Sequence, residues 1–151
     1  FTSLNEEILL QSEDLKIFGN KDFKVVSKRK PSSKQLKNLI FAFNVCRYVK
    51  SNAIVLTSNE TTVGIGSGQP SRLDSCQIAI EKMKKFNLTS EDLVAASDAF
   101  FPFIDGIEKL VQAGVRAVIQ PSGSIRDKEI INFANETDTV LIFSKTRHFR
   151  H

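Results

Sequence analysis

Apolar residues recur every three or four positions in four stretches of this chain, which predicts helices that each bury one face. Flanking residues support the boundaries, because Pro31-Ser32-Ser33 is a favourable helix start, Asp105 is a candidate N-cap and Gly114 a stop signal. The predicted helices span 34–49, 71–86, 105–113 and 126–135.

Short apolar runs between these stretches predict buried strands. The runs 53–57 and 62–66 are close enough in sequence to form a hairpin, whereas the later strands alternate with helices over short loops. Such alternation predicts an α/β fold with a parallel or mixed sheet covered by helices. The predicted strands span 23–27, 53–57, 62–66, 115–119 and 139–143, and a further apolar run covers 93–96.

The first twenty residues follow neither pattern. They are of mixed polarity and end in the turn-forming pair Gly19-Asn20, so we predict an arm or linker over 1–20 and one folded domain over 21–151. Because the chain begins with Phe1 rather than methionine, we expect it to be a piece of a longer polypeptide.

Length and composition fit one globular domain. The 151 residues include 41% hydrophobic and 25% charged positions, enough for a core and too few residues for two full-sized domains. No apolar run has transmembrane length, so we expect no membrane partner. The two cysteines, Cys46 and Cys76, make neither a disulfide framework nor a metal set, so we expect no metal and a reducing, cytoplasmic setting.

The formal charge of +4 is concentrated in a basic cluster over residues 21–37, behind an acidic start. Basic clusters bind nucleic acid when a groove-reading element accompanies them, and we find none. A solvated basic face is therefore the favoured interpretation, and no nucleic-acid partner is expected. A basic nucleic-acid-binding module stays open as an alternative, which strongly salt-dependent binding would support.

A glycine-rich segment, residues 64–72, joins a predicted strand to a predicted helix. Glycines let backbone N–H groups approach a ligand, and a helix N-terminus favours anions. Arg72 adds a cation that can bind an oxyanion with two hydrogen bonds. A plain tight turn explains the glycines equally well, because neither the dinucleotide-binding nor the P-loop pattern is present.

The loop Ser97–Asp105 holds three phenylalanines and a proline within four positions. One strand or one helix face cannot bury all of them, so exposed rings could stack on a flat heterocycle or form a subunit interface. Burial of single rings as anchors of the loop is the alternative. Asp105 could be a helix cap, or it could accept two N–H bonds from an amidine edge such as that of a pterin.

Polar residues also follow the next strand, in the segment 120–127, where open α/β sheets bind ligands. The chain ends Arg147-His148-Phe149-Arg150-His151, and Phe149 between cations indicates that this tail docks rather than frays. A terminal histidine is more often exposed than catalytic. No nucleophile–base pair or metal-ligand spacing occurs, so the residues indicate a binding unit without an evident set of catalytic residues.

Five motifs together resemble the C-terminal part of AICAR transformylase, an activity of the bifunctional purine-biosynthesis enzymes that also carry IMP cyclohydrolase. They occur in family order and cover roughly residues 34–151. They are Lys50-Ser51-Asn52-Ala53, Gly66-Ser67-Gly68-Gln69-Pro70-Ser71-Arg72, Ser97-Asp98-Ala99-Phe100-Phe101-Pro102-Phe103, Gln120-Pro121-Ser122-Gly123-Ser124 and Arg147-His148-Phe149-Arg150-His151.

The resemblance implies a cytidine-deaminase-like α/β fold, a mixed sheet covered by helices, as the second of two transformylase subdomains. It implies formyl transfer from 10-formyltetrahydrofolate to AICAR, in a homodimer with active sites between subunits. The N-terminal remainder of the same enzyme would be a further partner. The implied nucleotide-binding residues are Asn52, Arg72, Phe100, Arg147 and Phe149, and the folate-binding residues are Leu73, Pro102, Phe103, Asp105, Ser124 and Ile125.

The chain departs from the family pattern in ways that limit this expectation. The family's chemistry depends on a Lys-His pair that is absent here, so the isolated chain is predicted to be inactive. Ile104 stands where the family usually has arginine, and Pro70 where it has Met or Gln. A stand-alone, non-catalytic nucleotide- or folate-binding protein derived from the enzyme is the main alternative.

Overall fold

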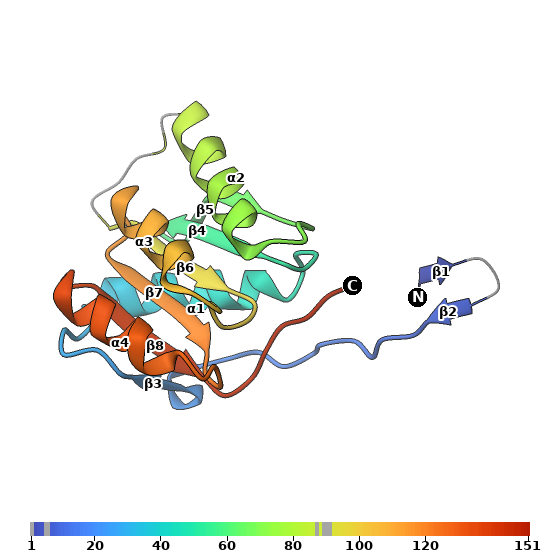
Figure 1. The fold of residues 1–151 in the computed structure, drawn as a ribbon, viewed down its shortest axis with the longest axis horizontal. Helices are drawn as coiled ribbons and strands as arrows, with labels where there is room; N and C mark the ends of the chain where they lie inside the picture. The colour runs from blue at the N-terminus through green and yellow to red at the C-terminus, as the bar shows by residue number, and fades with distance from the viewer. Residues whose placement is uncertain (1, 5–6, 87, 89–91) are drawn as a thin grey trace.

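A mixed sheet of six strands is the framework of the computed structural model, which describes residues 2–4, 7–86, 88 and 92–151. The strand order is β3-β8-β7-β6-β4-β5 (Figure 1). Strands β6, β7 and β8 run parallel, whereas the β3–β8, β4–β6 and β4–β5 pairs are antiparallel. This confirms the predicted α/β sheet. The bounds are β3 (Phe23–Val25), β4 (Ile54–Ser58), β5 (Thr61–Gly66), β6 (Val94–Ser97), β7 (Ala117–Pro121) and β8 (Val140–Ser144).

Helices cover both faces of this sheet (Figure 1). Successive strand residues point to opposite faces, so in β4 Ile54 and Leu56 join one hydrophobic cluster and Val55 joins the other. The first cluster is closed by α2, α3 and α4, and the second by α1. The helices are α1 (Ser33–Cys46), α2 (Arg72–Lys85), α3 (Ile104–Gln112) and α4 (Asp127–Glu136).

Two of the helix starts illustrate how local sequence acts. Helix α1 begins as predicted, because the Ser32 hydroxyl accepts from the Gln35 backbone N–H and the Gln35 side chain accepts from the Ser32 backbone N–H. The prediction for α3 was wrong: its N-cap is Phe103, which makes no side-chain cap bond, and Asp105 lies inside the first turn. The Asp105 Oδ1 accepts from the backbone N–H of Gly106 at 2.7 Å instead.

The predicted hairpin is confirmed in β4 and β5. Asn59 and Glu60 connect the strands with φ angles of 50° and 53°. Two successive residues of left-handed conformation are typical of the tight turns that match strand twist.

The predicted arm contains a small hairpin and a core residue. Strands β1 (Thr2–Leu4) and β2 (Glu7–Leu9) pair antiparallel and stand away from the body of the molecule (Figure 1). Phe18, in contrast, is 2% exposed and packs edge-on against Phe43 of α1. The turn of 3-10 helix at Asn20–Asp22 follows directly. Positions 1 and 5–6 of the arm lie outside the described residues.

Both cysteines are core residues. Cys46 and Cys76 are free and buried, on α1 and α2. Burial raises the pKa of the Cys76 thiol to about 12 and that of Cys46 well above its usual value. Neither thiol is therefore a thiolate nucleophile at neutral pH. Across the described ranges, no helix is long and apolar enough to cross a membrane.

Candidate functional site

Five segments meet at one edge of the sheet, which we call the carboxyl edge. The parallel strands β6, β7 and β8 all end there. Strand β4 begins there and β5 ends there, because Ile54 is in register with both Ser97 and Gly66. The topology therefore gathers the five motifs of the sequence, where open α/β sheets bind ligands. The segments are 50–53, 66–72, 97–103, 120–126 and 144–151.

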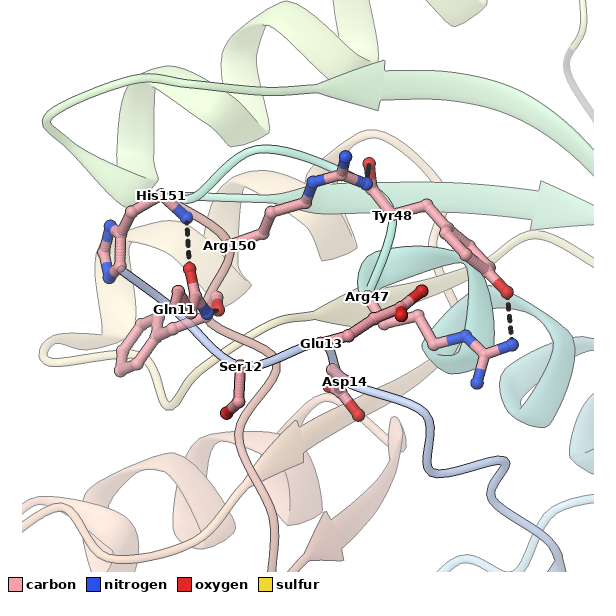
Figure 2. A pocket seen from close by; sticks show the side chains of 9 residues that line it. Gln11, Ser12, Glu13, Asp14, Arg47, Tyr48, Arg150 and His151 are labelled. Atoms are coloured by element: carbon pink, nitrogen blue, oxygen red, sulfur yellow. Dashed lines mark hydrogen bonds between the residues drawn. The ribbon is translucent and has the colours of Figure 1, made fainter. Parts of the chain in front are cut away.

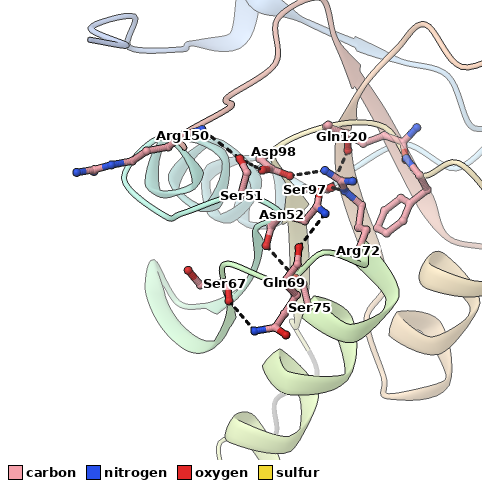
Figure 3. A network of polar contacts seen from close by, with 12 residues as sticks. Ser51, Asn52, Ser67, Gln69, Arg72, Ser75, Ser97, Asp98, Gln120 and Arg150 are labelled. Carbon is pink, nitrogen blue, oxygen red and sulfur yellow. Dashed lines mark hydrogen bonds and ion pairs between the residues drawn. The ribbon is translucent and has the colours of Figure 1, made fainter. Parts of the chain in front are cut away.

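A buried ion pair lies at the centre of this edge (Figure 3). The Arg72 Nη2 lies 2.7 Å from the Asp98 Oδ1, and the two side chains are 9% and 0% exposed. The Ser51 hydroxyl donates to the other carboxylate oxygen at 2.6 Å, and Arg72 Nε donates to the Ser97 hydroxyl oxygen at 2.9 Å. The Arg72 guanidinium is thus already paired with the Asp98 carboxylate and is not a free cation that could bind an anionic ligand without breaking this pair.

Asn52 holds the loop that leads into α2. The Asn52 side-chain amide donates to the backbone carbonyls of Gln69 and Pro70, both at 2.9 Å. The backbone carbonyl of Asn52 accepts from the Ser75 hydroxyl at 2.8 Å. Figure 3 shows this second set of contacts beside the ion pair. Asn52, a predicted nucleotide-binding residue, therefore shapes the glycine-rich loop.

The glycines of β5 serve helix packing. A Cβ atom on Gly64 would lie 2.1 Å from the carbonyl oxygen of Ala79, and one on Gly66 would lie 1.8 Å from that of Ser75. Both distances are far inside van der Waals contact, so only glycine lets α2 lie this close to the strand. Close packing of α2 against β5, a role that was not predicted from the sequence, therefore explains the glycines at these two positions. Gly68, with φ +69°, is the glycine that the turn itself requires.

The phenylalanine loop divides its rings between core and surface. Phe101 is 1% exposed and lies against Gly106 of α3, so it anchors the loop in the core. Phe103 is 52% exposed, and Phe100 is half-buried. The Arg147 guanidinium lies over the Phe100 ring, 4.7 Å from its centroid. Phe101 thus follows the alternative of a buried anchor, whereas Phe103 is exposed. The structure also brings together Phe100 and Arg147, two of the predicted nucleotide-binding residues.

The segment after β7 is held by one carboxylate. Asp127 accepts from the backbone N–H groups of Gly123 at 2.8 Å and Ser124 at 3.2 Å. Ile125 consequently projects from the loop at 99% exposure. The Arg126 guanidinium lies 4.8 Å from the Phe103 ring centroid, which joins this loop to the phenylalanine loop. The other predicted folate-side residues are Leu73, partly buried at the start of α2, and Pro102 and Asp105, exposed before and within α3.

The C-terminal tail docks, as predicted, but through His148. This side chain is 1% exposed, which corrects the expectation of an exposed terminal histidine. Its ring packs against Phe18 and Phe43, and its backbone N–H donates to the Asp98 carbonyl at 2.9 Å. The Nδ1 atom contacts the Asp14 carboxylate of the arm.

Acidification is expected to destabilise the folded chain through His148. Burial lowers the pKa of this imidazole below its usual 6.5, and the hydrogen bond to Asp14 opposes the shift only in part. The unfolded chain therefore binds the proton more readily, so this contribution to stability is complete above about pH 6.5 and is lost as pH falls towards the folded pKa. Urea unfolding at pH 7.5 and 5.5 measures it. The pH dependence should shrink in His148→Gln and persist in His151→Gln; equal dependence in all three proteins would contradict the assignment.

A hollow of about 420 Å³ lies between the arm, the end of α1 and the last three residues (Figure 2). Phe149, 37% exposed, lines this hollow, and its carbonyl accepts from the Gln11 side chain. The predicted nucleotide ligand Phe149 therefore faces the arm rather than joining Phe100 and Arg147. The lining residues are Gln11, Ser12, Glu13, Asp14, Arg47, Tyr48, Phe149, Arg150 and His151.

Three polar residues of the edge were not singled out from the sequence. Asp98 and Ser51 stand inside quoted motifs, but their pairing with Arg72 joins positions far apart in the chain. Gln120 is fully buried; its Oε1 accepts from the Phe101 N–H at 3.3 Å, and within the described residues its Nε2 has no partner.

Among the residues that the structure describes, no group of three or more His, Cys, Asp or Glu could hold a metal ion.

Known proteins resemble this chain along nearly its whole length. Relatives named bifunctional purine biosynthesis protein PurH include that of Persephonella marina, 46% identical over 144 residues, or 95% of this chain and 28% of the relative. The Chlorobium phaeobacteroides protein is 48% identical over 144 residues, 95% and 27% of the two chains. The Chlorobium chlorochromatii protein is 46% identical over 151 residues, 100% and 29%.

The chain thus spans less than a third of the length of these relatives. A model of the AICARFT/IMPCHase bienzyme family matches residues 1–82, which is more than half of the 151 residues. The chain belongs to the AICARFT/IMPCHase bienzyme family.

Proposed function

We propose that this chain is the C-terminal part of a bifunctional purine-biosynthesis enzyme and supplies binding residues for its AICAR transformylase reaction. In that reaction the AICAR amine attacks the formyl carbon of 10-formyltetrahydrofolate, and the bond from that carbon to N10 breaks. The observation that carries the proposal is the convergence of all five motif segments at the carboxyl edge. Family membership and the length of the relatives support it.

The nucleotide side centres on Phe100 and Arg147. Arg147 is exposed and held over the Phe100 ring, which leaves guanidinium N–H groups at the surface to bind an anionic or carbonyl oxygen. Phe100 offers a flat apolar face to the base. Arg72 and Asn52, whose side chains are committed to Asp98 and to the loop at 69–70, support this side by fixing its shape.

The folate side lies along the phenylalanine loop and the loop after β7. Pro102, Phe103 and Ile125 are exposed apolar groups on neighbouring loops, suited to the flat pterin and the benzoyl ring. The Asp105 carboxylate is exposed, and its spare acceptor sites can receive ring N–H groups. Ser124 and Leu73 flank this apolar surface.

The amine must lose a proton and N10 must gain one during the reaction. Within this chain Asp98 is held in an ion pair and His148 is buried against Phe18 and Phe43, so neither is placed to exchange that proton. The absent Lys-His pair would then come from the preceding part of the enzyme, in a dimer whose subunits share each site.

A formyl-transfer assay on two proteins tests this proposal. The longer polypeptide that contains this chain is expected to formylate AICAR, whereas the isolated 151 residues should show no turnover, because they lack the catalytic pair. Turnover by the isolated chain at a rate comparable with that of the longer protein would refute it. Tight binding of AICAR or folate by the isolated chain alone would instead favour a stand-alone binding protein.

A further inference from the structure

Each of the four polar atoms of Asp98 makes a contact, and the four contacts reach three other segments of the carboxyl edge, 50–53, 66–72 and 144–151. Its backbone N–H donates to the Ala53 carbonyl at 3.2 Å, and its carbonyl accepts from the His148 N–H at 2.9 Å. Its side-chain oxygens accept from Arg72 at 2.7 Å and from Ser51 at 2.6 Å. We call Asp98, Ser51 and Arg72 the Asp98 cluster.

The cluster fixes the tail at two points. The first is the bond from His148 to the Asp98 carbonyl. The second passes through Ser51, whose hydroxyl oxygen accepts from the Arg150 N–H at 3.1 Å and whose own N–H donates to the Arg150 carbonyl at 2.8 Å. Because the Ser51 hydroxyl donates its hydrogen bond to the Asp98 carboxylate, its oxygen lone pair is free to accept from the Arg150 backbone N–H (Figure 3).

These two points determine where Arg147 lies. Arg147 immediately precedes His148, and Phe100 follows Asp98 by two residues, so both members of the Phe100–Arg147 pair are attached to the cluster. Arg147 itself is exposed, so backbone anchors rather than burial of its side chain hold it in place. Burial of the Asp98 carboxylate beside the Arg72 guanidinium keeps this ion pair strong, because water does not compete for it.

We propose that Asp98 is a positioning residue that holds the tail so that Arg147 lies over Phe100, ready for the nucleotide. The nucleotide part of this inference rests on the proposed function, whereas the tail part does not. Asp98 acts through Ser51 and the tail backbone and does not touch the ligand.

Two variants of the longer polypeptide test the inference. Asp98→Asn removes the carboxylate charge, and Ser51→Ala removes the hydroxyl that accepts from the Arg150 N–H. Ser51→Ala leaves intact both the Arg72–Asp98 pair and the bond from the Ser51 backbone N–H to the Arg150 carbonyl. Ser51→Ala keeps the test decisive if the unpaired Arg72 prevents Asp98→Asn from folding. The matched control is Asp138→Asn, which breaks the exposed pair with Arg29.

Hydrogen exchange of the ligand-free protein provides the first readout. The Arg150 amide is expected to exchange at least tenfold faster in both variants than in the control, since its acceptor is lost or misoriented. Unchanged exchange in Ser51→Ala would overturn the inference whether or not the protein transfers formyl groups. If the wild-type longer polypeptide showed no formyl transfer, that result would refute the proposed function but not the positioning of the tail by Asp98.

Nucleotide binding provides the second readout. Each variant is expected to raise the Kd for AICAR about tenfold and to leave the folate Kd within twofold, because only the nucleotide side depends on the tail. A double variant that combines Arg147→Ala with Asp98→Asn or Ser51→Ala should bind AICAR no more weakly than Arg147→Ala alone, because the side chain that the Asp98 cluster positions is already absent. Equal loss for both ligands, or full additivity with Arg147→Ala, would show a general structural role and overturn the inference.

Discussion

Gly66→Ala is expected to lower the free energy of unfolding by about 3 kcal/mol or more, at the upper end of the range for overpacked sites. The added methyl group would lie 1.8 Å from the Ser75 carbonyl oxygen and 2.7 Å from its Cα. These are backbone atoms of α2, so no side-chain rotation relieves the clash. The helix would have to move off the strand, which opens the core formed by Cys76 and Ala79. Urea unfolding monitored by circular dichroism measures the loss.

Gly19→Ala is the matched control. Apart from Gly19 itself and its two chain neighbours, no residue has a heavy atom within 4 Å of a Cβ built on Gly19, whose extended φ of −132° suits alanine. Its stability should therefore stay within about 0.5 kcal/mol of wild type, as for other surface substitutions. If Gly66→Ala were equally stable and only lost ligand affinity, the glycine would serve approach of a ligand, and the packing interpretation would fail.

The fold was predictable because its signals are local. Alternation of apolar runs and helical repeats placed each helix and five of the six strands of the main sheet to within a few residues. The sixth strand, β6, lies at the apolar run 93–96, which was noted without being assigned as a strand. Ser32 with Gln35 marked the start of α1. The start of α3 was missed because aspartate is a common cap. There Phe103 occupies the cap, and the buried Phe101 fixes the entry of the chain into the helix.

The site was predictable as a set of segments but not as a set of contacts. Polar or glycine-rich residues follow several predicted strands, and the carboxyl ends of parallel strands meet at one edge of a sheet, so the segments could be expected there. The order of the strands was not predicted. The Arg72–Asp98 bond joins residues 26 positions apart, and the His148–Asp14 contact joins residues 134 apart. Nothing in the local pattern distinguishes these side chains from exposed charges, since burial is decided by elements elsewhere in the chain. For this reason His148, which was expected to be exposed in the C-terminal tail, is buried in the structure.

Arg147→Ala in the longer polypeptide is expected to weaken AICAR binding by about 1.5–3 kcal/mol, or roughly 10- to 150-fold. Arg147 is the exposed cation of the Phe100 pair, whereas Arg72 is committed to Asp98 and Ser97. Under the proposed function, its loss would remove a charge-assisted hydrogen bond to the nucleotide. The core stays intact, so the unfolding midpoint should not change. Isothermal titration with AICAR measures the effect.

Two further variants separate the geometry of Arg147 from its charge. Arg147→Lys keeps the positive charge but loses the planar fork and its stacking on Phe100, so it should recover only part of the affinity. Arg116→Ala removes an exposed arginine that precedes β7, at the opposite end of that strand from the carboxyl edge, and should bind AICAR as the wild type does. Equal losses in Arg147→Ala and Arg116→Ala would mean that net charge alone attracts the nucleotide. Equal affinity in Arg147→Ala and wild type would remove this residue from the site, and with it the reason for a tail held by Asp98.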